Sequence, residues 1–229
     1  MRNSLKHSLI PAAALLMLVL VTSACVTAKF KPVKKIGEVK AKETLIVGRI
    51  ILVPPLQKDE QIFGTGMFDK SEETFRNKVF LITDDTYRRL PSNLGTKEWG
   101  SMIGATFDEP FYVKGASKPF FILAGMVKMQ SYTTQTGRVV YIHDENAWLP
   151  GGLKVNLQPT DRAVYIGTVK YHRNEFFDIT KAEIIDEFKK VRQEFQKKFG
   201  RELPLQKRMV VVLKSDKSKG GKKTGKKKK

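Results

Sequence analysis

TLIVGRIILV, the stretch from Thr44 to Val53, decides the fold of this chain. It consists largely of β-branched and aliphatic residues and ends at Pro54-Pro55, which is typical of a β-strand followed by a turn. Further runs of this type predict strands at Lys78–Thr83, Phe111–Val113, Pro119–Met129, Arg138–His143, Leu153–Leu157, Arg162–Tyr171, Glu175–Ile179 and Lys207–Leu213. Short strands about 8 to 15 residues apart, separated by turn residues rather than helices, predict a mainly-β fold, either a β-sandwich or an open barrel.

One later stretch has a helical pattern instead. Thr180 and Glu183 have the spacing of a capping box, and Gly200 stands where a helix end favours glycine. Between them, apolar residues recur at helical spacing. We therefore expect one amphipathic helix over Lys181–Phe199, packed on the sandwich through the stripe Ile184, Phe188, Val191, Phe195 and Phe199.

The tetrapeptide Val164-Tyr165-Ile166-Gly167, together with this helix, resembles the C-terminal end of several uncharacterised bacterial lipoproteins. The resemblance covers about a fifth of the chain and implies an immunoglobulin-like or transthyretin-like sandwich. It implies nothing about activity.

The N-terminal segment is typical of a secretory signal peptide. Arg2 and Lys6 precede an uncharged apolar run over Ser8–Val21, which is shorter than the about 20 residues of a membrane-spanning helix. Cys25, the only cysteine of the chain, follows this run directly. The domain after it must therefore fold without disulfide bonds.

The residues Val21–Cys25 (VTSAC) resemble the lipobox of bacterial lipoproteins, with threonine where leucine is commoner. The resemblance implies cleavage before Cys25, which would then carry acyl chains such as palmitate and attach the protein to a membrane. Val26 after the cysteine implies the outer membrane in a host that has two. Two alternatives remain open: cleavage after Ala28, which would release a soluble protein, and an uncleaved anchor helix over Ser8–Val26.

The formal net charge of +19 is concentrated at the two ends of the chain. Residues Val26–Lys42 hold six lysines against Glu38, and Lys214–Lys229 hold nine against Asp216, so the body between them carries only about +4. This distribution argues against a nucleic-acid-binding fold, which would present basic and aromatic residues on its folded surface. It divides the chain into a signal peptide (1–24), a lipidated basic tether (25–42), one β-rich globular domain (43–213) and a disordered polybasic tail (214–229).

The tail has two interpretations. Its low complexity is typical of a solvated end without a binding role. Its charge also suits docking to an anionic envelope polymer or an acidic protein. In that second interpretation, the docking residues are Lys222, Lys223, Lys226, Lys227, Lys228 and Lys229.

No pattern in the sequence predicts a catalytic residue, a metal or a cofactor. His143 and His172 each end a predicted strand and would form a metal or hydrolytic site only if those strands were neighbours, so surface turns explain them better. The chain lacks a G-x-S-x-G motif, and Gly64-Thr65-Gly66 lacks the following residues of a phosphate loop. An envelope hydrolase that uses His143, His172 and nearby carboxylates is kept as the alternative function.

The stretch Pro91–Pro110 is long for a connection inside one domain, and such loops are often functional. Trp99 and Met102 give it apolar surface, which predicts a binding loop. The alternative is that the loop folds back so that Trp99 completes the core. Together, the patterns predict a lipid-anchored cell-envelope protein that acts as a non-enzymatic binding or structural module at a membrane surface.

Overall fold

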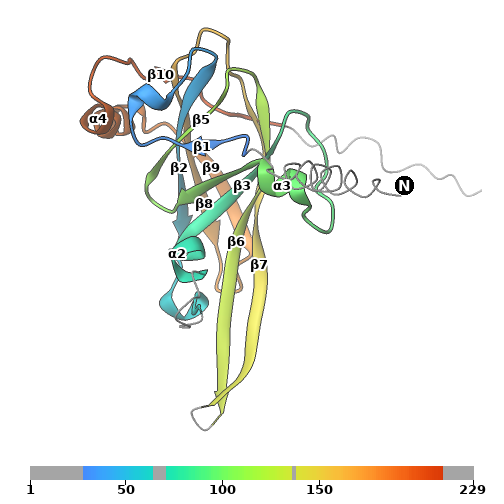
Figure 1. The fold of residues 1–229 in the computed structure, drawn as a ribbon. Helices are drawn as coiled ribbons and strands as arrows, with labels where there is room; N and C mark the ends of the chain where they lie inside the picture. The colour runs from blue at the N-terminus through green and yellow to red at the C-terminus, as the bar shows by residue number, and fades with distance from the viewer. Residues whose placement is uncertain (1–27, 64–70, 136–137, 214–229) are drawn as a thin grey trace, which may run out of the picture.

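Two β-sheets lie face to face in this protein, with short helices around them (Figure 1). The structure is a computed structural model and describes residues 28–63, 71–135 and 138–213. The arrangement confirms the mainly-β sandwich with one amphipathic C-terminal helix that the sequence predicts.

Sheet A has six strands in the described part of the chain. Its order is β1 (Lys31–Pro32), β5 (Pro110–Ala116), β2 (Glu43–Val53), β8 (Ala163–Arg173) and β10 (Gln206–Lys207), with β9 (Ile179–Ile185) also paired to β8. β2 is antiparallel to β5 and parallel to β8. Nearly all of β2 is buried, because one of its faces lies inside the sandwich and the other lies under a helix. This explains why its sequence is an unbroken apolar run rather than an alternating one.

Sheet B is antiparallel and has five strands within the described ranges. Its order is β11 (Val211–Val212), β7 (Arg138–Val155), β6 (Phe120–Gln135), β3 (Lys78–Asp84) and β4 (Met102–Thr106). β6 and β7 form a long hairpin whose far end projects beyond the sandwich (Figure 1). The predicted strands Arg138–His143 and Leu153–Leu157 are therefore not separate, since β7 contains the first and most of the second.

The main hydrophobic core lies between the two sheets, and both contribute to it. Among its buried side chains are Ile46, Ile50, Leu81, Ile103, Phe120, Ile122, Leu149, Val164 and Tyr171. A second buried cluster lies between the outer face of sheet A and the helix α4 (Phe188–Phe199), and it includes Val33, Leu45, Val47, Tyr165, Val191 and Phe195.

The helix is shorter than the predicted Lys181–Phe199, because residues 181–185 belong to strand β9 (Ile179–Ile185) and α4 begins at Phe188. β9 pairs with β8, so that Ile184 lies opposite Val169 and packs against the main core. Pairing of this strand with β8 outweighs the capping-box pattern, which is only a local preference. The other four residues of the predicted stripe lie on α4, where Val191 and Phe195 are fully buried.

The predicted tether over residues 25–42 is wrong from Lys29 to Lys42, because these residues are folded. From Lys29 onward the chain belongs to the folded domain, which therefore begins well before Glu43. Phe30, Val33 and Val39 are buried, β1 pairs with β5, and a 3-10 turn, η1, covers Ile36–Glu38. These apolar residues are spaced at multiples of three positions, and the lysines between them obscured this spacing.

The predicted loop Pro91–Pro110 contains a short helix, α3 (Thr96–Gly100), and the edge strand β4.

Two other short elements, η2 (Lys58–Glu60) and α2 (Ser71–Phe75), precede β3. The predicted strand Glu175–Ile179 is mainly the turn that joins β8 to β9. The predicted final strand Lys207–Leu213 is divided, because the chain crosses from β10 in sheet A to β11 in sheet B.

Candidate functional site

A groove of about 930 Å³ lies along the side of the sandwich where β7 faces the turn between β8 and β9. Its volume falls in the range of about 300–1,000 Å³ that is usual for ligand sites. We call it the acidic groove, because its lining includes five carboxylates, Asp59, Glu60, Glu145, Glu175 and Asp178. Its apolar lining includes Leu123, Met129, Ala147, Trp148, Phe176, Phe177 and Ile179.

The β8–β9 turn forms one wall of the acidic groove. The side-chain oxygen of Asn174 accepts hydrogen bonds from the backbone N–H groups of Phe176 (3.0 Å) and Asp178 (2.8 Å). Asparagine is favoured in turns because its short side chain can satisfy backbone donors in this way. The turn leaves Phe176 78% exposed, which is unusual for a side chain of this size and provides apolar contact surface at the groove.

Arg173 connects this wall to η2. Its guanidinium is buried, binds both oxygens of the Glu60 carboxylate, and donates to the carbonyl oxygens of Pro54 (3.0 Å) and Pro55 (2.9 Å). Burial would raise the pKa of Glu60, but the hydrogen bonds from Arg173 and from the Gln57 amide outweigh burial and hold this pKa below its usual value. Glu60 is therefore ionised and rigidly placed at physiological pH.

Strand β7 forms the opposite wall. The buried Tyr171 hydroxyl donates a hydrogen bond of 2.8 Å to the carbonyl oxygen of Pro150 and so connects β8 in sheet A to β7 in sheet B. Burial also raises the pKa of Tyr171, which keeps the hydroxyl protonated as a donor. Next to this contact, Trp148 is 44% exposed on β7 and contributes its ring to the lining of the groove.

The base of the β6–β7 hairpin, beside the acidic groove, is held by Gln61. This side chain is buried, donates to the carbonyl oxygen of Lys128 (2.7 Å) and accepts the N–H of Asn77 (2.7 Å). The adjacent N–H of Ile62 donates to the carbonyl oxygen of Gln130 (2.7 Å). A buried side-chain amide whose nitrogen and oxygen both form hydrogen bonds holds the groups around it in one arrangement. The position of β6 beside η2 is therefore well defined.

The electrostatics of the acidic groove differ from those of the whole chain. Among the described residues, Arg173 neutralises Glu60, whereas no lysine or arginine forms an ion pair with Asp59, Glu145, Glu175 or Asp178. A chain with a net charge of +19 thus concentrates unneutralised negative charge in the acidic groove. Such a site favours cations, and its exposed aromatic rings favour ligands that also have apolar or cationic groups.

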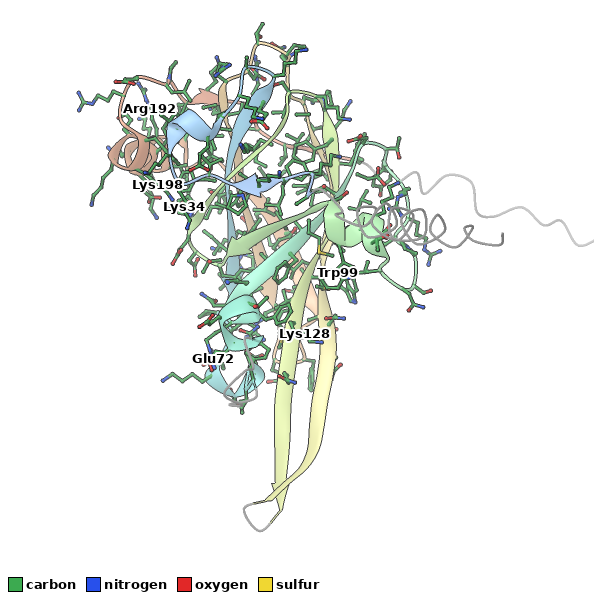
Figure 2. The ribbon with its side chains drawn as sticks, in the orientation of Figure 1. Lys34, Glu72, Trp99, Lys128, Arg192 and Lys198 are labelled. Carbon is green, nitrogen blue, oxygen red and sulfur yellow. The ribbon has the colours of Figure 1, made fainter. Side chains whose placement is uncertain are left out.

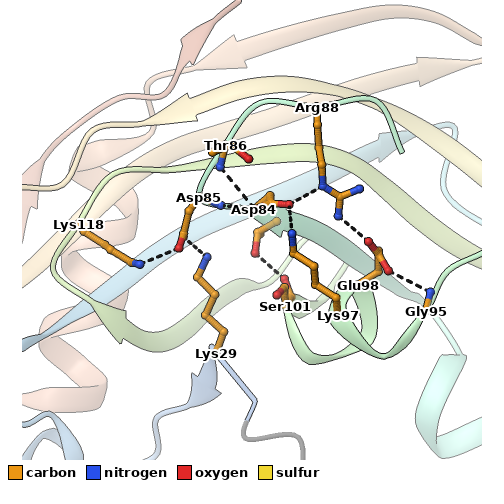
Figure 3. Close-up of polar contacts among 11 residues, drawn as sticks. Lys29, Asp84, Asp85, Thr86, Arg88, Gly95, Lys97, Glu98, Ser101 and Lys118 are labelled. Atoms are coloured by element: carbon orange, nitrogen blue, oxygen red, sulfur yellow. Dashed lines mark hydrogen bonds and ion pairs between the residues drawn. The ribbon is translucent and has the colours of Figure 1, made fainter. Parts of the chain in front are cut away.

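The second polar cluster of interest surrounds α3 at the end of β3 (Figure 3). Arg88 binds Asp84 (Nε to Oδ2, 2.5 Å) and Glu98 (Nη2 to Oε1, 2.5 Å), and Lys97 lies 3.1 Å from Asp84. Asp84 also accepts the N–H of Asp85 (2.7 Å), as expected for an aspartate in a turn. Asp85 in turn pairs with Lys29 and with Lys118 (2.6 Å). We call these residues the α3 cluster.

The α3 cluster fixes the pKa values of its carboxyl groups. Burial would raise the pKa of Asp84, but the hydrogen bonds from Arg88 and Lys97 outweigh it and lower this pKa well below the usual range. The hydrogen bond from Arg88 likewise lowers the pKa of Glu98. Both groups are ionised at neutral pH, so α3 is attached to β3 by charge-assisted hydrogen bonds.

The structure separates the two histidines that were candidates for a hydrolytic site. His143 lies in β7 of sheet B, opposite Ser131, and His172 lies in β8 of sheet A, opposite Val53 and Lys181. The Nε2 atom of His172 is 3.0 Å from the Glu183 carboxylate at the sheet surface. Among the described residues, no group of three or more His, Cys, Asp or Glu side chains could hold a metal ion.

The other predicted site residues have different outcomes. Trp99 lies on α3 and is 51% exposed, so it does not complete the core, and Met102 is half-buried at the start of β4. The part of the predicted loop that contains these two residues forms a regular helix and a strand. Cys25 and the tail lysines Lys222, Lys223, Lys226, Lys227, Lys228 and Lys229 lie outside the described residues.

The residues of the acidic groove were missed by the sequence analysis. The groove combines η2, β6, β7 and the β8–β9 turn, which are far apart in the sequence. The one local signal is the pair Phe176-Phe177 inside the polar stretch RNEFFD, because aromatic residues in a turn need a contact partner.

Comparisons with protein-family models, with curated proteins and with solved structures give no match to this chain. In the part of the chain that the structure describes, no helix is long and apolar enough to cross a membrane. The functional conclusions therefore rest on the residues themselves.

Proposed function

We propose that the protein is a lipid-anchored protein of the cell envelope, attached through Cys25, and that it works as a non-enzymatic binding module. The observation that carries the binding role is the acidic groove, which joins unneutralised carboxylates and exposed aromatic rings in one hollow. The lipobox-like residues Val21–Cys25 support the anchor, with the outer membrane as its place in a host that has two.

The chemistry of the acidic groove favours a cationic peptide segment that also has apolar side chains. Lysine or arginine side chains would neutralise Glu145 and Glu175, which have no ion-pair partner in the described structure. Apolar side chains would cover Trp148 and Phe176. Hydrophobic contact provides most of the affinity in such a site, and charge complementarity provides selectivity.

The anchor is tested by metabolic labelling with a palmitate analogue. The wild-type protein should incorporate the label and the Cys25→Ala variant should not, because the cysteine is the acylated residue. Equal labelling of both proteins would contradict the anchor.

Binding by the groove is tested with the Trp99→Phe variant, in which Trp148 is the only tryptophan. A synthetic peptide of alternating lysine and leucine should change the emission of Trp148 in a saturable way, and a peptide of alternating lysine and serine should bind more weakly. The additional change of Glu145 and Glu175 to glutamine should weaken binding about tenfold, which is about 1.4 kcal/mol.

The matched control for this experiment is Glu72→Gln with Glu202→Gln. Both glutamates are exposed and lie outside the groove lining, so the control removes the same charge elsewhere. Equal loss of binding in the two double variants would show a general charge effect and would contradict a specific site.

A further inference from the structure

We infer that the exposed face of α3, centred on Trp99, lies against the headgroup region of the membrane that carries the acylated Cys25. This inference rests on the proposed lipid anchor and adds the orientation of the domain on the membrane. It assigns a lipid surface as the partner of Trp99.

The start of the folded domain is fixed directly beside Trp99. The backbone N–H of Lys29 donates a hydrogen bond of 2.8 Å to the carbonyl oxygen of Gly100, and the Lys29 ammonium pairs with Asp85 in the α3 cluster (Figure 3). The next residue, Phe30, is buried and packs on Phe120 with ring centroids 5.0 Å apart. The chain therefore joins the domain at a rigid point that is one residue away from Trp99.

The distance from this point to the lipid is short. Cys25 precedes Lys29 by four residues, and four extended residues span at most about 14 Å. Acyl chains on Cys25 would hold Lys29, and α3 beside it, within about that distance of the bilayer surface. So short a connection cannot turn the domain over, and the face next to Lys29 must be the one that meets the membrane.

The composition of this face suits lipid headgroups. Tryptophan is enriched where the apolar core of a bilayer meets water, because its ring is apolar while its N–H can still donate a hydrogen bond. The α3 cluster contains Lys29, Arg88, Lys97 and Lys118 against Asp84, Asp85 and Glu98, and it therefore keeps a small positive excess. Lys97 and Lys118 are the most exposed of these cations and can reach lipid phosphates.

Other surfaces of the domain point elsewhere. Figure 2 shows Arg192 and Lys198 of α4 on the opposite side of the molecule from Trp99. The second tryptophan, Trp148, lies in the acidic groove, whose negative charge would be repelled by an anionic membrane. The two tryptophans of the chain therefore belong to different elements, Trp99 to α3 and Trp148 to β7 in the lining of the acidic groove.

The test uses the full-length acylated protein, reconstituted into phosphatidylcholine vesicles whose acyl chains are brominated near the headgroup. Bromine quenches tryptophan emission only at short range. The Trp148→Phe variant retains Trp99 alone, and the matched Trp99→Phe variant retains Trp148 alone. We expect brominated vesicles to remove about half or more of the Trp99 emission and to shift it to shorter wavelength, while the emission of Trp148 stays close to its value in unbrominated vesicles.

The outcomes separate this inference from the anchor itself. If the protein floats with the vesicles but Trp99 is not quenched, or is quenched no more than Trp148, the orientation is wrong and the anchor stands. If the acylated protein does not float with the vesicles, the anchor and the orientation fail together. Should Trp148→Phe fold poorly, the wild-type signal minus that of Trp99→Phe gives the quenching of Trp99.

Discussion

α4 and α3 arrange their side chains in opposite ways. α4 turns Val191 and Phe195 into a buried cluster and its lysines outward, as an amphipathic helix of a stable domain does. α3 buries Glu98, which is 6% exposed, and presents Trp99 to solvent. Burial of these apolar side chains stabilises the folded domain, and this is sufficient to explain the arrangement of α4. The exposed ring of Trp99 on α3 contributes little to folding, which is consistent with the membrane contact that we propose for it.

The largest expected effect is that of Phe195→Ala, which tests the buried side of the comparison. Phe195 is fully buried and packs on Phe199 (ring centroids 5.2 Å apart) and Tyr112 (6.5 Å). Its truncation should lower the free energy of unfolding by about 3–5 kcal/mol. Urea unfolding followed by circular dichroism measures this loss. A loss of less than about 1 kcal/mol would mean that α4 isn't part of the stable core.

A smaller effect is expected for Glu98→Ala, which removes the buried carboxylate of α3. Arg88 and the N–H of Gly95 would each lose a hydrogen bond, so the free energy of unfolding should fall by about 1–3 kcal/mol. Glu72→Ala is the control, because Glu72 forms an exposed ion pair with Arg76 and should cost at most about 0.5 kcal/mol. Equal losses in the two variants would contradict the inverted arrangement.

The same cluster predicts a pH dependence. Asp84 and Glu98 have lowered pKa values in the folded protein, so they bind fewer protons than in the unfolded chain as the pH falls. Their contribution to stability is therefore complete above the ordinary carboxyl pKa values of 3.8 and 4.5 and is lost progressively below them. Between pH 6 and pH 3, the Asp84→Asn, Glu98→Gln variant should lose less stability than the wild type, by on the order of 1 kcal/mol. Parallel curves would contradict this.

The smallest effect on stability is expected for Trp99→Ala. Since half of its surface is already in water, the substitution should change the free energy of unfolding by no more than about 0.5 kcal/mol. A thermal melt of the domain checks this value. A loss comparable to that of Phe195→Ala would show that Trp99 is a core residue, and the contrast between the two helices would then disappear.

The sequence predicted the strands whose apolar residues form unbroken runs, because such runs have few alternatives to a buried strand. β2, β3 and β8 are the clearest cases, and their observed bounds lie within two residues of the predicted ones. The sequence analysis predicted two strands where the structure has β7. The segment between those two predicted strands includes Pro150-Gly151-Gly152, a composition typical of a turn. In the structure the strand continues through these residues, with a positive φ of 77° at Gly152 and a register shift against β6. Proline is tolerated there because Pro150 lies at this irregularity in the pairing, where the regular hydrogen-bond ladder is interrupted.

The candidate sites could be predicted only in part. Trp99 was singled out because it is a large apolar residue in a long predicted loop. Its place on the inverted helix α3 depends on the ion pairs of Arg88 and Asp84, which no spacing rule predicts. The acidic groove requires four segments to meet, and their meeting depends on buried polar contacts such as Gln61 to Lys128. Local sequence patterns contain no information on such long-range pairs.

The parallel pairing of β2 with β8 has a consequence for the time at which the protein can fold. Leu45 lies opposite Ala163, so the central strand is synthesised roughly 120 residues before the partner that buries its second edge. At about 5–20 residues per second, the ribosome needs some seconds to supply β8, and long-range pairing of this kind is slow even then. The nascent chain therefore cannot complete its β-sandwich until β8 has been synthesised. An export channel that accepts only unfolded polypeptide would find it in a transportable state.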